Sequence, residues 1–450
     1  MNKYRIEKDS IGEIEVLDDK LWGAQTQRSY NNFKIGHNTM PIEVIKAIAI
    51  VKKNSALVNN QLGLLEDIKT NEIVRATNEI INNQHNNQFP LSIYQTGSGT
   101  QTNMNVNEVI AHIANVDVHP NDDANKGQSS NDVFPTAIHI ATVMETNSRL
   151  IPAISTLESS FEKLEEEFKD IIKIGRTHLQ DATPLTLGQE FSGYKSMLKT
   201  SKEMIIDSYK YLYPLAIGGT AVGTGLNTHK DFGKLVSDKI SKETNFKFYS
   251  SENKFHSLTT RDALLLAHSS VKTLATNLMK IANDIRLLAS GPNCGIGEIT
   301  IPANEPGSSI MPGKINPTQT EALTMVCVKV MGNDTTLTIA NSQGNFELNV
   351  YMPVMISTYL ESIELLTDSI NSFNDKCVIG IKANKTKIKE NLDKSLMLVT
   401  CLNTYIGYEN SAKIAKYAYK NSLSLRDAAI KLKILTAEEF DEYFKIESMI

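Results

Sequence analysis

One stretch of the sequence, residues 307–317, combines residue types that can bind an anion and react with it. It reads Gly-Ser-Ser-Ile-Met-Pro-Gly-Lys-Ile-Asn-Pro, so a lysine charge stands close to serine hydroxyls and an asparagine amide. Pro317 suits the first turn of a helix, where backbone N–H groups can also face an anion. The stretch therefore predicts an anion-binding loop. An ordinary surface loop and nucleophilic serine chemistry remain alternatives at this point.

A second polar stretch, residues 94–103, precedes a helix expected over 104–114. It contains Ser98, Gly99 and Thr100, and its two glycines permit close approach of the backbone. The composition fits another anion-binding loop at a helix start. Taken alone, however, the pattern favours an ordinary polar turn.

A third polar region contains two clusters of hydroxyl, amide and acidic groups. Their members are His119, Pro120, Asn121 and Asp122, then Ser129, Ser130 and Asn131. Ser129 or Ser130 is expected to cap the N-terminus of a helix. A capping hydroxyl can share its loop with a ligand site, so this expectation is compatible with binding.

A histidine stands in a glycine-flanked break between expected helices. A lone histidine is most often a satisfied core residue, but His178 lies beside Arg176, Thr177 and Gln180. This setting favours a functional histidine, because imidazole changes charge near neutral pH. Residues 215–226 are glycine-rich but lack the Gly-Lys-Ser/Thr pattern of a nucleotide-binding P-loop, so they predict a tight structural turn.

Long helices must hold these loops in place. Apolar residues recur at alternating steps of four and three over 150–171 and 271–288, and further long patterns run through 323–330 and from 348 to about 370. Helices with such seams pack at shallow angles into bundles. They bury only part of their surface within one chain, so we expect the bundle to be shared between copies.

The remaining elements are shorter. Helices are expected over 41–63 and 66–83, whereas residues 22–28 look extended. The sequence thus predicts a mainly α fold in three domains. They are an N-terminal domain with substrate loops (1–128), a central domain with a bundle of long helices (129–385), and a small C-terminal helical domain (386–450).

Composition and charge exclude several functional classes. The chain has 450 residues, 41% hydrophobic and 22% charged, with a net charge of -5. Its lysines are scattered, which argues against a nucleic-acid partner. Four widely spaced cysteines form no metal-binding or redox pattern. No run suits a bilayer span and no secretory signal is visible, so we expect a cytoplasmic protein without a membrane partner.

Taken together, the polar stretches resemble the fumarase/aspartase superfamily, whose signature loop is similar to residues 307–317. The resemblance covers nearly the whole chain, and several further stretches match class II fumarases in order. These are residues 96–100, 119–122, 129–131, 175–178 and 344–349. Related aspartases are expected to carry glutamine in place of His178.

The resemblance implies the reversible hydration of fumarate to L-malate without a metal or an organic cofactor. It also implies a homotetramer whose central domains form one large bundle, with each active site built from loops of three subunits. By this resemblance Ser308 is the base at carbon, Lys314 stabilises the aci-carboxylate, and His178, paired with Glu321, handles the water. The implied substrate contacts are Ser98, Gly99, Thr100, Ser129, Ser130, Asn131, Thr177, Ser309, Lys314, Ile315 and Asn316.

One departure from the family pattern concerns a second dicarboxylate site at the surface. The family often has an arginine shortly before the His-Pro-Asn-Asp element, where this chain has Val116. The candidate second site keeps His119, Pro120, Asn121 and Asp122 but lacks that charge. Two alternatives to fumarate hydration stay open: an aspartase-type ammonia-lyase and a non-catalytic structural homologue.

Overall fold

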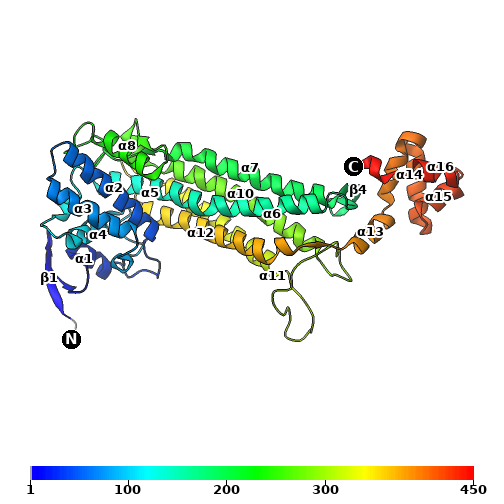
Figure 1. The fold of residues 1–450 in the computed structure, drawn as a ribbon, viewed down its shortest axis with the longest axis horizontal. Coiled ribbons are helices and arrows are strands. Elements are labelled where there is room, and N and C mark those ends of the chain that lie inside the picture. The colour runs from blue at the N-terminus through cyan, green and yellow to red at the C-terminus, as the bar shows by residue number, and fades with distance from the viewer. Residues whose placement is uncertain (1–2) are drawn as a thin grey trace. The chain divides into compact units, whose positions relative to one another are not determined.

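The computed structural model describes residues 3–450 and shows a mainly α-helical protein (Figure 1). Across these residues there are sixteen α-helices and eight short strands, and the strands pair in four two-stranded sheets. The chain forms two compact units. The first unit comprises Met1–Pro152, Ser201–Ala275 and Val326–Thr367, and the second comprises Ala153–Thr200, Thr276–Met325 and Asp368–Ile450. The expected mainly α class is confirmed, and the three domain boundaries stay a prediction.

The first unit begins with a β-hairpin and a group of packed helices. Its early elements are β1 (Tyr4–Asp9), β2 (Gly12–Leu17), α1 (Ala24–Asn32), α2 (Ile42–Gln61), α3 (Asp67–Ile81), α4 (Thr100–Ile113), a π-helical turn η2 (Pro120–Ala124) and α5 (Ser130–Glu145). Helix α2 contacts α3, α4, α5 and α8. Most of its residues are buried, including the polar Lys52, Asn54 and Asn59, as expected for a helix at the centre of a domain. The helices expected over 41–63 and 66–83 are confirmed.

Helix α1 corrects the expectation that residues 22–28 are extended. The carboxylate of Glu108, on α4, accepts hydrogen bonds from the backbone N–H groups of Gly23 (2.9 Å), Gln25 (2.9 Å) and Thr26 (3.2 Å). A carboxylate at this place satisfies N–H groups that a helix start leaves unpaired and complements the helix dipole. The cap comes from a distant part of the chain, so local sequence carried no helix signal.

Five long helices form the bundle (Figure 1). They are α6 (Ile151–Glu167), α7 (Leu187–Leu212), α10 (Asp262–Leu288), α11 (Thr318–Asn341) and α12 (Met352–Lys376). The long patterns at 150–171, 271–288, 323–330 and 348–370 are confirmed as α6, α10, α11 and α12. Helix α7 was not predicted from the sequence. Its apolar seam is interrupted by two serines, Ser201 and Ser208, which are nevertheless buried.

The first unit is completed by short elements around a glycine-rich turn. They are β5 (Pro214–Leu215), α8 (Phe232–Thr244), β6 (Tyr249–Ser250) and α9 (Lys254–Thr259). Strands β5 and β6 pair in parallel. The turn between β5 and α8 has left-handed backbone at Gly218 (φ 94°) and Thr220 (φ 53°), and this confirms the tight turn expected there.

The second unit contains a hairpin and the C-terminal helices. Its elements beyond the long helices are β3 (Ile172–Thr177), β4 (Gln180–Thr186), β7 (Ile299–Thr300), β8 (Lys382–Ala383), α13 (Lys385–Lys394), α14 (Asn403–Asn421), α15 (Leu425–Lys431) and α16 (Ala437–Tyr443). The expected break around His178 is therefore an antiparallel hairpin. The short helices expected past residue 385 are confirmed, and they pack around a small core that also includes Ile174 of β3.

Candidate active site

In the first unit, hydroxyl groups from two loops border one cavity of about 400 Å³. Thr100, Ser129 and Ser130 line it, and the Ser98 hydroxyl lies 2.7 Å from that of Thr100. The structure thus brings together four hydroxyls that are about 30 residues apart in sequence. Neutral hydroxyls arranged in this way can donate hydrogen bonds to a carboxylate.

Glycine is required at position 99 for these hydroxyls to meet. Gly99 is the N-cap of α4 with a left-handed φ of 74°. A Cβ atom added to it would lie 2.3 Å from the Phe134 ring. Any larger residue would move the start of α4, and Thr100 with it.

Ser129 caps the N-terminus of α5, which confirms the expectation that Ser129 or Ser130 would do so. Its side chain accepts a hydrogen bond from the Asn131 N–H at 3.2 Å, and the Asp132 carboxylate accepts one from the Ser129 N–H at 2.9 Å. This is a capping box. Asn131 points its amide to the carbonyl of Ala221 at 2.8 Å, so it fixes the glycine-rich turn beside the cavity.

Several residues that line the cavity were not predicted as site residues. They are Gln25, Met104, Asn125, Gly127, Gln128, Thr220, Ala221, Leu226 and Asn227. Asn121, which was expected at the candidate second site, also lines this cavity. The glycine-rich turn reaches the cavity because the N–H groups of Gly218 and Thr220 both donate to the buried Asp132 carboxylate at 2.9 Å. Gln128 directly precedes the predicted cluster of Ser129, Ser130 and Asn131, but nothing in the sequence signalled the place of Asn125.

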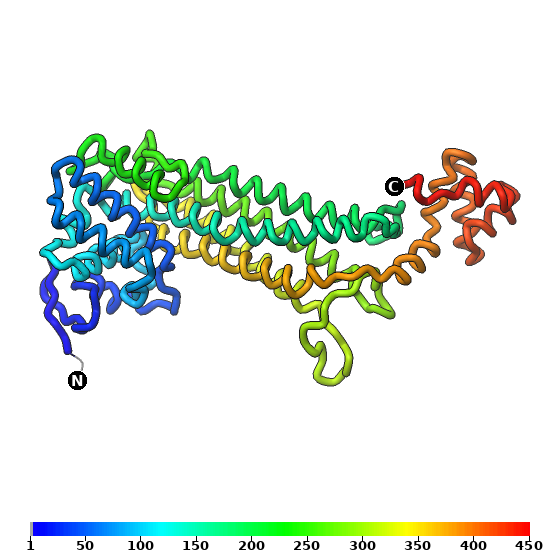
Figure 2. Tube along the Cα trace, viewed as in Figure 1, coloured from blue at the N-terminus to red at the C-terminus, as the bar shows by residue number. Residues whose placement is uncertain are grey.

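In the second unit, residues 307–317 form a loop that precedes α11 (Figure 2). The Gly307 N–H donates to the Lys314 carbonyl at 2.8 Å, and the Asn316 amide donates to the Gly307 carbonyl at 2.7 Å. These two bonds close the loop at its base. Ser309, Ile315 and the Lys314 side chain are exposed, which leaves them free to meet a ligand or another subunit.

The side chain of Ser308 is hydrogen-bonded to the backbone of its own loop. Its Oγ accepts hydrogen bonds from the backbone N–H groups of Ile310 (3.3 Å) and Met311 (3.1 Å). Two such donors stabilise negative charge on the oxygen and therefore favour an alkoxide. The geometry suits a serine that must give up its proton.

His178 lies at the tip of the β3–β4 hairpin and is exposed. His178 (φ 57°) and Leu179 (φ 59°) both have left-handed backbone, at positions where such turns normally carry asparagine or glycine. Non-glycine residues in this region store strain, which is found most often at functional sites. Thr177 precedes the turn and is also exposed.

A buried ion-pair cluster holds the hairpin that carries His178. Arg176 donates to both oxygens of Glu298 at 2.6 and 3.0 Å, and Lys173 lies 3.3 Å from Glu298 and 3.0 Å from Glu190. Glu298 is fully buried. Burial raises the pKa of Glu298, but the Arg176 hydrogen bonds and the Lys173 charge outweigh it and leave the pKa below its ordinary value.

The expected pair of His178 and Glu321 is not joined within one chain. Both side chains are exposed, and no hydrogen bond or ion pair connects them among residues 3–450. The pair stays a prediction that requires another subunit or a movement of the loop.

The candidate second site is partly organised. His119 and Asp122 are exposed, and the His119 ring nitrogen Nδ1 accepts the N–H groups of Asn121 (3.3 Å) and Asp122 (3.1 Å). A nitrogen that accepts backbone N–H groups carries no proton, so the 3.3 Å approach to the Asp122 carboxylate is not a charged pair. Pro120 begins the π-helical turn η2.

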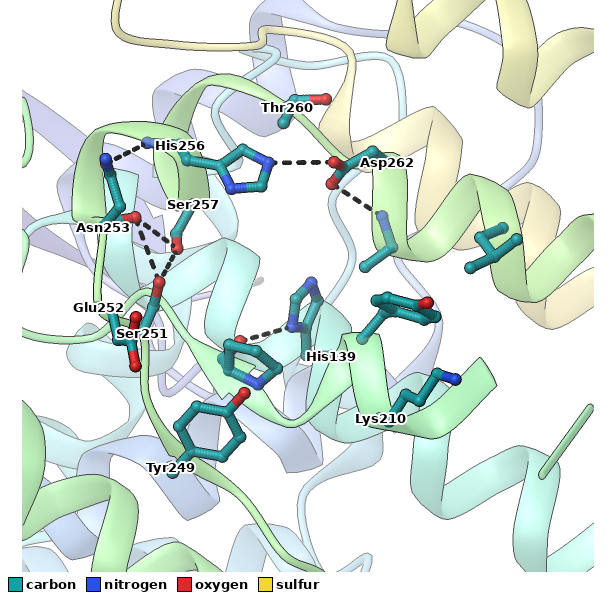
Figure 3. Close-up of a pocket in the computed structure, with 14 residues that line it drawn as sticks. His139, Lys210, Tyr249, Ser251, Glu252, Asn253, His256, Ser257, Thr260 and Asp262 are labelled. Atoms are coloured by element: carbon teal, nitrogen blue, oxygen red, sulfur yellow. Dashed lines mark hydrogen bonds and ion pairs between the residues drawn. The ribbon is translucent and has the colours of Figure 1, made fainter. Parts of the chain in front are cut away.

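A separate cavity of about 750 Å³ in the first unit is lined by none of the predicted site residues (Figure 3). His139 donates from Nδ1 to the Pro214 carbonyl at 2.9 Å, and burial lowers its pKa to about 4. His256 and Asp262 lie 3.0 Å apart on the opposite wall. These contacts connect α5 to β5 and α9 to the start of α10, which fits a structural role.

In the part of the chain that the structure describes, no group of three or more His, Cys, Asp or Glu side chains could hold a metal ion. Of the helices formed by residues 3–450, none has both the length and the hydrophobicity needed to cross a bilayer. The cytoplasmic location stays a prediction.

Comparison with known proteins decides the family. A profile described as "Lyase" matches residues 12–332, and one described as "Fumarase C C-terminus" matches residues 398–450. The "Fumarate hydratase class II" of Bacillus subtilis (strain 168) is 56% identical over 100% of this chain and 99% of its own length. A relative of the same name from Helicobacter pylori is 57% identical with the same coverage. The chain belongs to the class II fumarase family.

Solved structures agree with this family assignment. A class II fumarase from Schistosoma mansoni superimposes with a TM-score of 0.97 at 45% identity, covering 99% of each chain. A fumarate lyase:delta crystallin from Brucella melitensis superimposes with a TM-score of 0.95 at 36% identity and the same coverage. The resemblance inferred from the sequence is confirmed, together with the fumarase/aspartase-like fold and its long helical bundle.

Proposed function

We propose that the protein catalyses the reversible hydration of fumarate to L-malate, as a fumarate hydratase. The observation that carries the proposal is full-length identity of 56–57% to relatives named fumarate hydratase class II. Enzymes of this name act on a small dicarboxylate. The cavity bordered by Thr100, Ser129 and Ser130 offers neutral hydroxyl donors for one of its carboxylates.

Ser308 is proposed to remove the proton from the carbon next to a carboxylate of L-malate. The electron pair of the broken C–H bond moves into that carboxylate, which then carries two negative charges as an aci-carboxylate. Lys314 and Asn316 are assigned to stabilise this charge, because preorganised donors are usually the largest catalytic term. The two N–H groups that point at Ser308 Oγ support its role as base.

His178 is proposed to act at the other carbon. The electron pair returns from the aci-carboxylate to form the double bond and expels the hydroxyl group, to which the protonated imidazole gives a proton, so that water leaves. Glu321 is assigned as the partner that raises the basicity of His178 and fixes its tautomer. In the hydration direction the same groups act in reverse order.

The complete site is proposed to assemble in a homotetramer, with loops from three subunits. Thr177, Ser309 and Ile315 belong to the proposed substrate contacts, together with the hydroxyl cavity. Support comes from the exposure of the residues on the signature loop and the hairpin tip, and from the absence of a contact between His178 and Glu321 among residues 3–450. Groups that face solvent in one chain can meet when further copies are added.

Two substrates measured with the purified wild-type protein test the function. The loss of the conjugated double bond of fumarate is followed by ultraviolet absorbance, and ammonia release from L-aspartate is measured in parallel. We expect efficient interconversion of fumarate and L-malate and negligible ammonia release. Faster turnover of L-aspartate would identify an ammonia-lyase instead, and no turnover of either would identify a non-catalytic homologue.

A further inference from the structure

A fully buried lysine lies beneath the hydroxyl cavity. Lys52 is on α2 with no exposed surface, and its Nζ lies 2.7 Å from Asn125 Oδ1 and 3.0 Å from Gln128 Oε1. Asn125 and Gln128 both line the cavity. A buried ammonium group is costly unless it is paired and hydrogen-bonded, and nothing in the family resemblance assigned Lys52 a role.

The two amides are turned so that their oxygens face Lys52. The Asn125 amide nitrogen donates to the Gln128 carbonyl at 3.2 Å, and the Gln128 amide nitrogen donates to the Lys126 carbonyl at 3.1 Å. With their N–H groups engaged by the backbone, both amides can only accept from the lysine. Two acceptor oxygens on one Nζ suit the charged ammonium form.

This arrangement is connected to the cavity hydroxyls. The amide nitrogen of Asn103, a buried residue on α4, lies 3.1 Å from Asn125 Oδ1 and 3.0 Å from Ser130 Oγ. Ser130 accepts the Asn103 hydrogen bond, so its own proton is free to point to a ligand oxygen. Lys52 therefore influences Ser130 through Asn125 and Asn103.

Asp132 is the charged group that acts on Lys52. It is fully buried, and its negative charge favours the ammonium form of the lysine. Burial lowers the pKa of Lys52 to about 7, and Asp132 opposes that effect. A dicarboxylate in the cavity acts in the same direction as Asp132 and favours the ammonium form.

We propose that Lys52 is a positioning residue of the dicarboxylate site, which holds Asn125 and Gln128, orients Ser130 through Asn103, and supplies buried positive charge that favours a dianion. The inference rests on the proposed fumarate hydratase function. Lys52 does not touch the ligand. Its contribution is to the binding of the second negative charge, so it discriminates dicarboxylates from monocarboxylates.

The test compares Lys52→Met with a matched control, Lys53→Met. Lys53 is the next residue of α2, but it pairs with Glu243 at 2.9 Å, away from the cavity. Binding of succinate, a non-reactive dianion, and of succinamate, its monoanionic amide, is measured by calorimetry. We expect Lys52→Met to weaken succinate binding about tenfold or more and succinamate binding clearly less, because an interaction with a charged group is lost. Lys53→Met should bind both as the wild type does.

A second variant separates charge from hydrogen bonding. Lys52→Gln can still donate to Asn125 but carries no charge, and it should also lose the preference for succinate over succinamate. Kinetics with L-malate should show a larger rise in KM than fall in kcat for both variants. Equal weakening of both ligands, or unchanged binding, overturns the proposal. So does failure of both variants to fold, since Lys52 would then serve the fold.

The two proposals fail in different ways. A wild-type protein that binds succinate but does not turn over L-malate contradicts the proposed function. In that case the ratio of the affinities for succinate and succinamate still tests the proposed role of Lys52. Normal wild-type turnover with an unchanged ratio in Lys52→Met contradicts only the inference about Lys52.

Discussion

The proposed role of Ser308 as a base depends on the backbone around its side chain. Two N–H groups within the same loop point at its oxygen, at 3.3 and 3.1 Å. A serine hydroxyl has far too high a pKa to act alone, and donors held in place before the reaction lower the energy of the alkoxide without reorganisation. The role of Ser308 thus requires the loop to keep this conformation.

Replacing Ser308 tests its proposed role. Ser308→Ala should lower kcat by at least about a hundredfold, the usual contribution of general base catalysis, while the unfolding temperature changes little. Ser159→Ala, at an exposed serine of α6, is the control and should leave both unchanged. A loss of activity smaller than about tenfold would mean that Ser308 is not the base.

His119 tests whether the His-Pro-Asn-Asp element belongs to catalysis. The element lacks the arginine expected near Val116, and His119 Nδ1 caps the turn by accepting two N–H groups. His119→Asn keeps an acceptor for this cap, so the fold should persist. We expect L-malate turnover in steady-state assays to change hardly at all. A collapse of kcat would place the element in the catalytic centre.

At the scale of elements, the hairpin that carries His178 depends on a buried ion-pair cluster. Glu298 connects β3 to the segment before β7 through Arg176, and Asn391 of α13 donates to it at 3.1 Å. The strained backbone at His178 and Leu179 persists only if the surrounding structure holds it. We infer that the cluster fixes the place of His178.

Breaking the cluster should reduce stability and activity together. Glu298→Gln leaves Lys173 with Glu190 alone, so we expect a loss of about 3 kcal/mol, the lower end for breaking a buried pair. Denaturant unfolding measures this loss. Asp441→Asn is the matched control: it removes a bidentate pair with Arg426 at 2.8 and 2.9 Å that is exposed on the surface. The control should change stability little.

The same cluster predicts a pH dependence of stability. The pKa of Glu298 is lower in the folded protein than its ordinary value of 4.5. Its stabilising contribution is therefore complete above that ordinary value and is lost as pH falls through the lower, folded-state pKa. Thermal unfolding below about pH 4.5 should show a shallower pH dependence for Glu298→Gln than for the wild type. Parallel curves would mean that Glu298 is not charged in the fold.

At the scale of the whole molecule, one long helix has apolar residues without partners in a single chain. Helix α11 buries Leu323 and Val330, yet Met325 is 68% exposed and Val328 is 61% exposed. A helix that is apolar on several sides belongs inside a larger assembly. This supports the shared bundle that the heptad spacing predicts.

Sedimentation tests the assembly. The wild type should sediment with a mass near four chains, and Val328→Glu should shift it to smaller species because the charge would be buried at the interface. Activity should fall in proportion to the loss of tetramer, since the proposed sites are shared. A stable and active monomer would contradict both the tetramer and the shared sites.

Part of this protein was determined by its sequence alone. Heptad spacing identified α6 and α10, because a long helix must repeat its apolar residues with the helical period. Residues 307–317 resemble the signature loop of the superfamily, and the comparisons show that the chain belongs to that family. Long periodic helices and dense polar loops are each visible within one continuous stretch of sequence, so they can be recognised without a structure.

The rest was decided by tertiary contacts. The start of α1 depends on Glu108 from α4. The apolar seam of α7 is interrupted by serines that are buried only in the folded protein. The place of Lys52 is the strongest case. Within α2 it looks like one of many helical lysines, and only the packing of η2 and α4 against α2 brings Asn125 to its Nζ. Local sequence cannot encode such contacts, because the partners are far apart in the chain and meet only when the core forms.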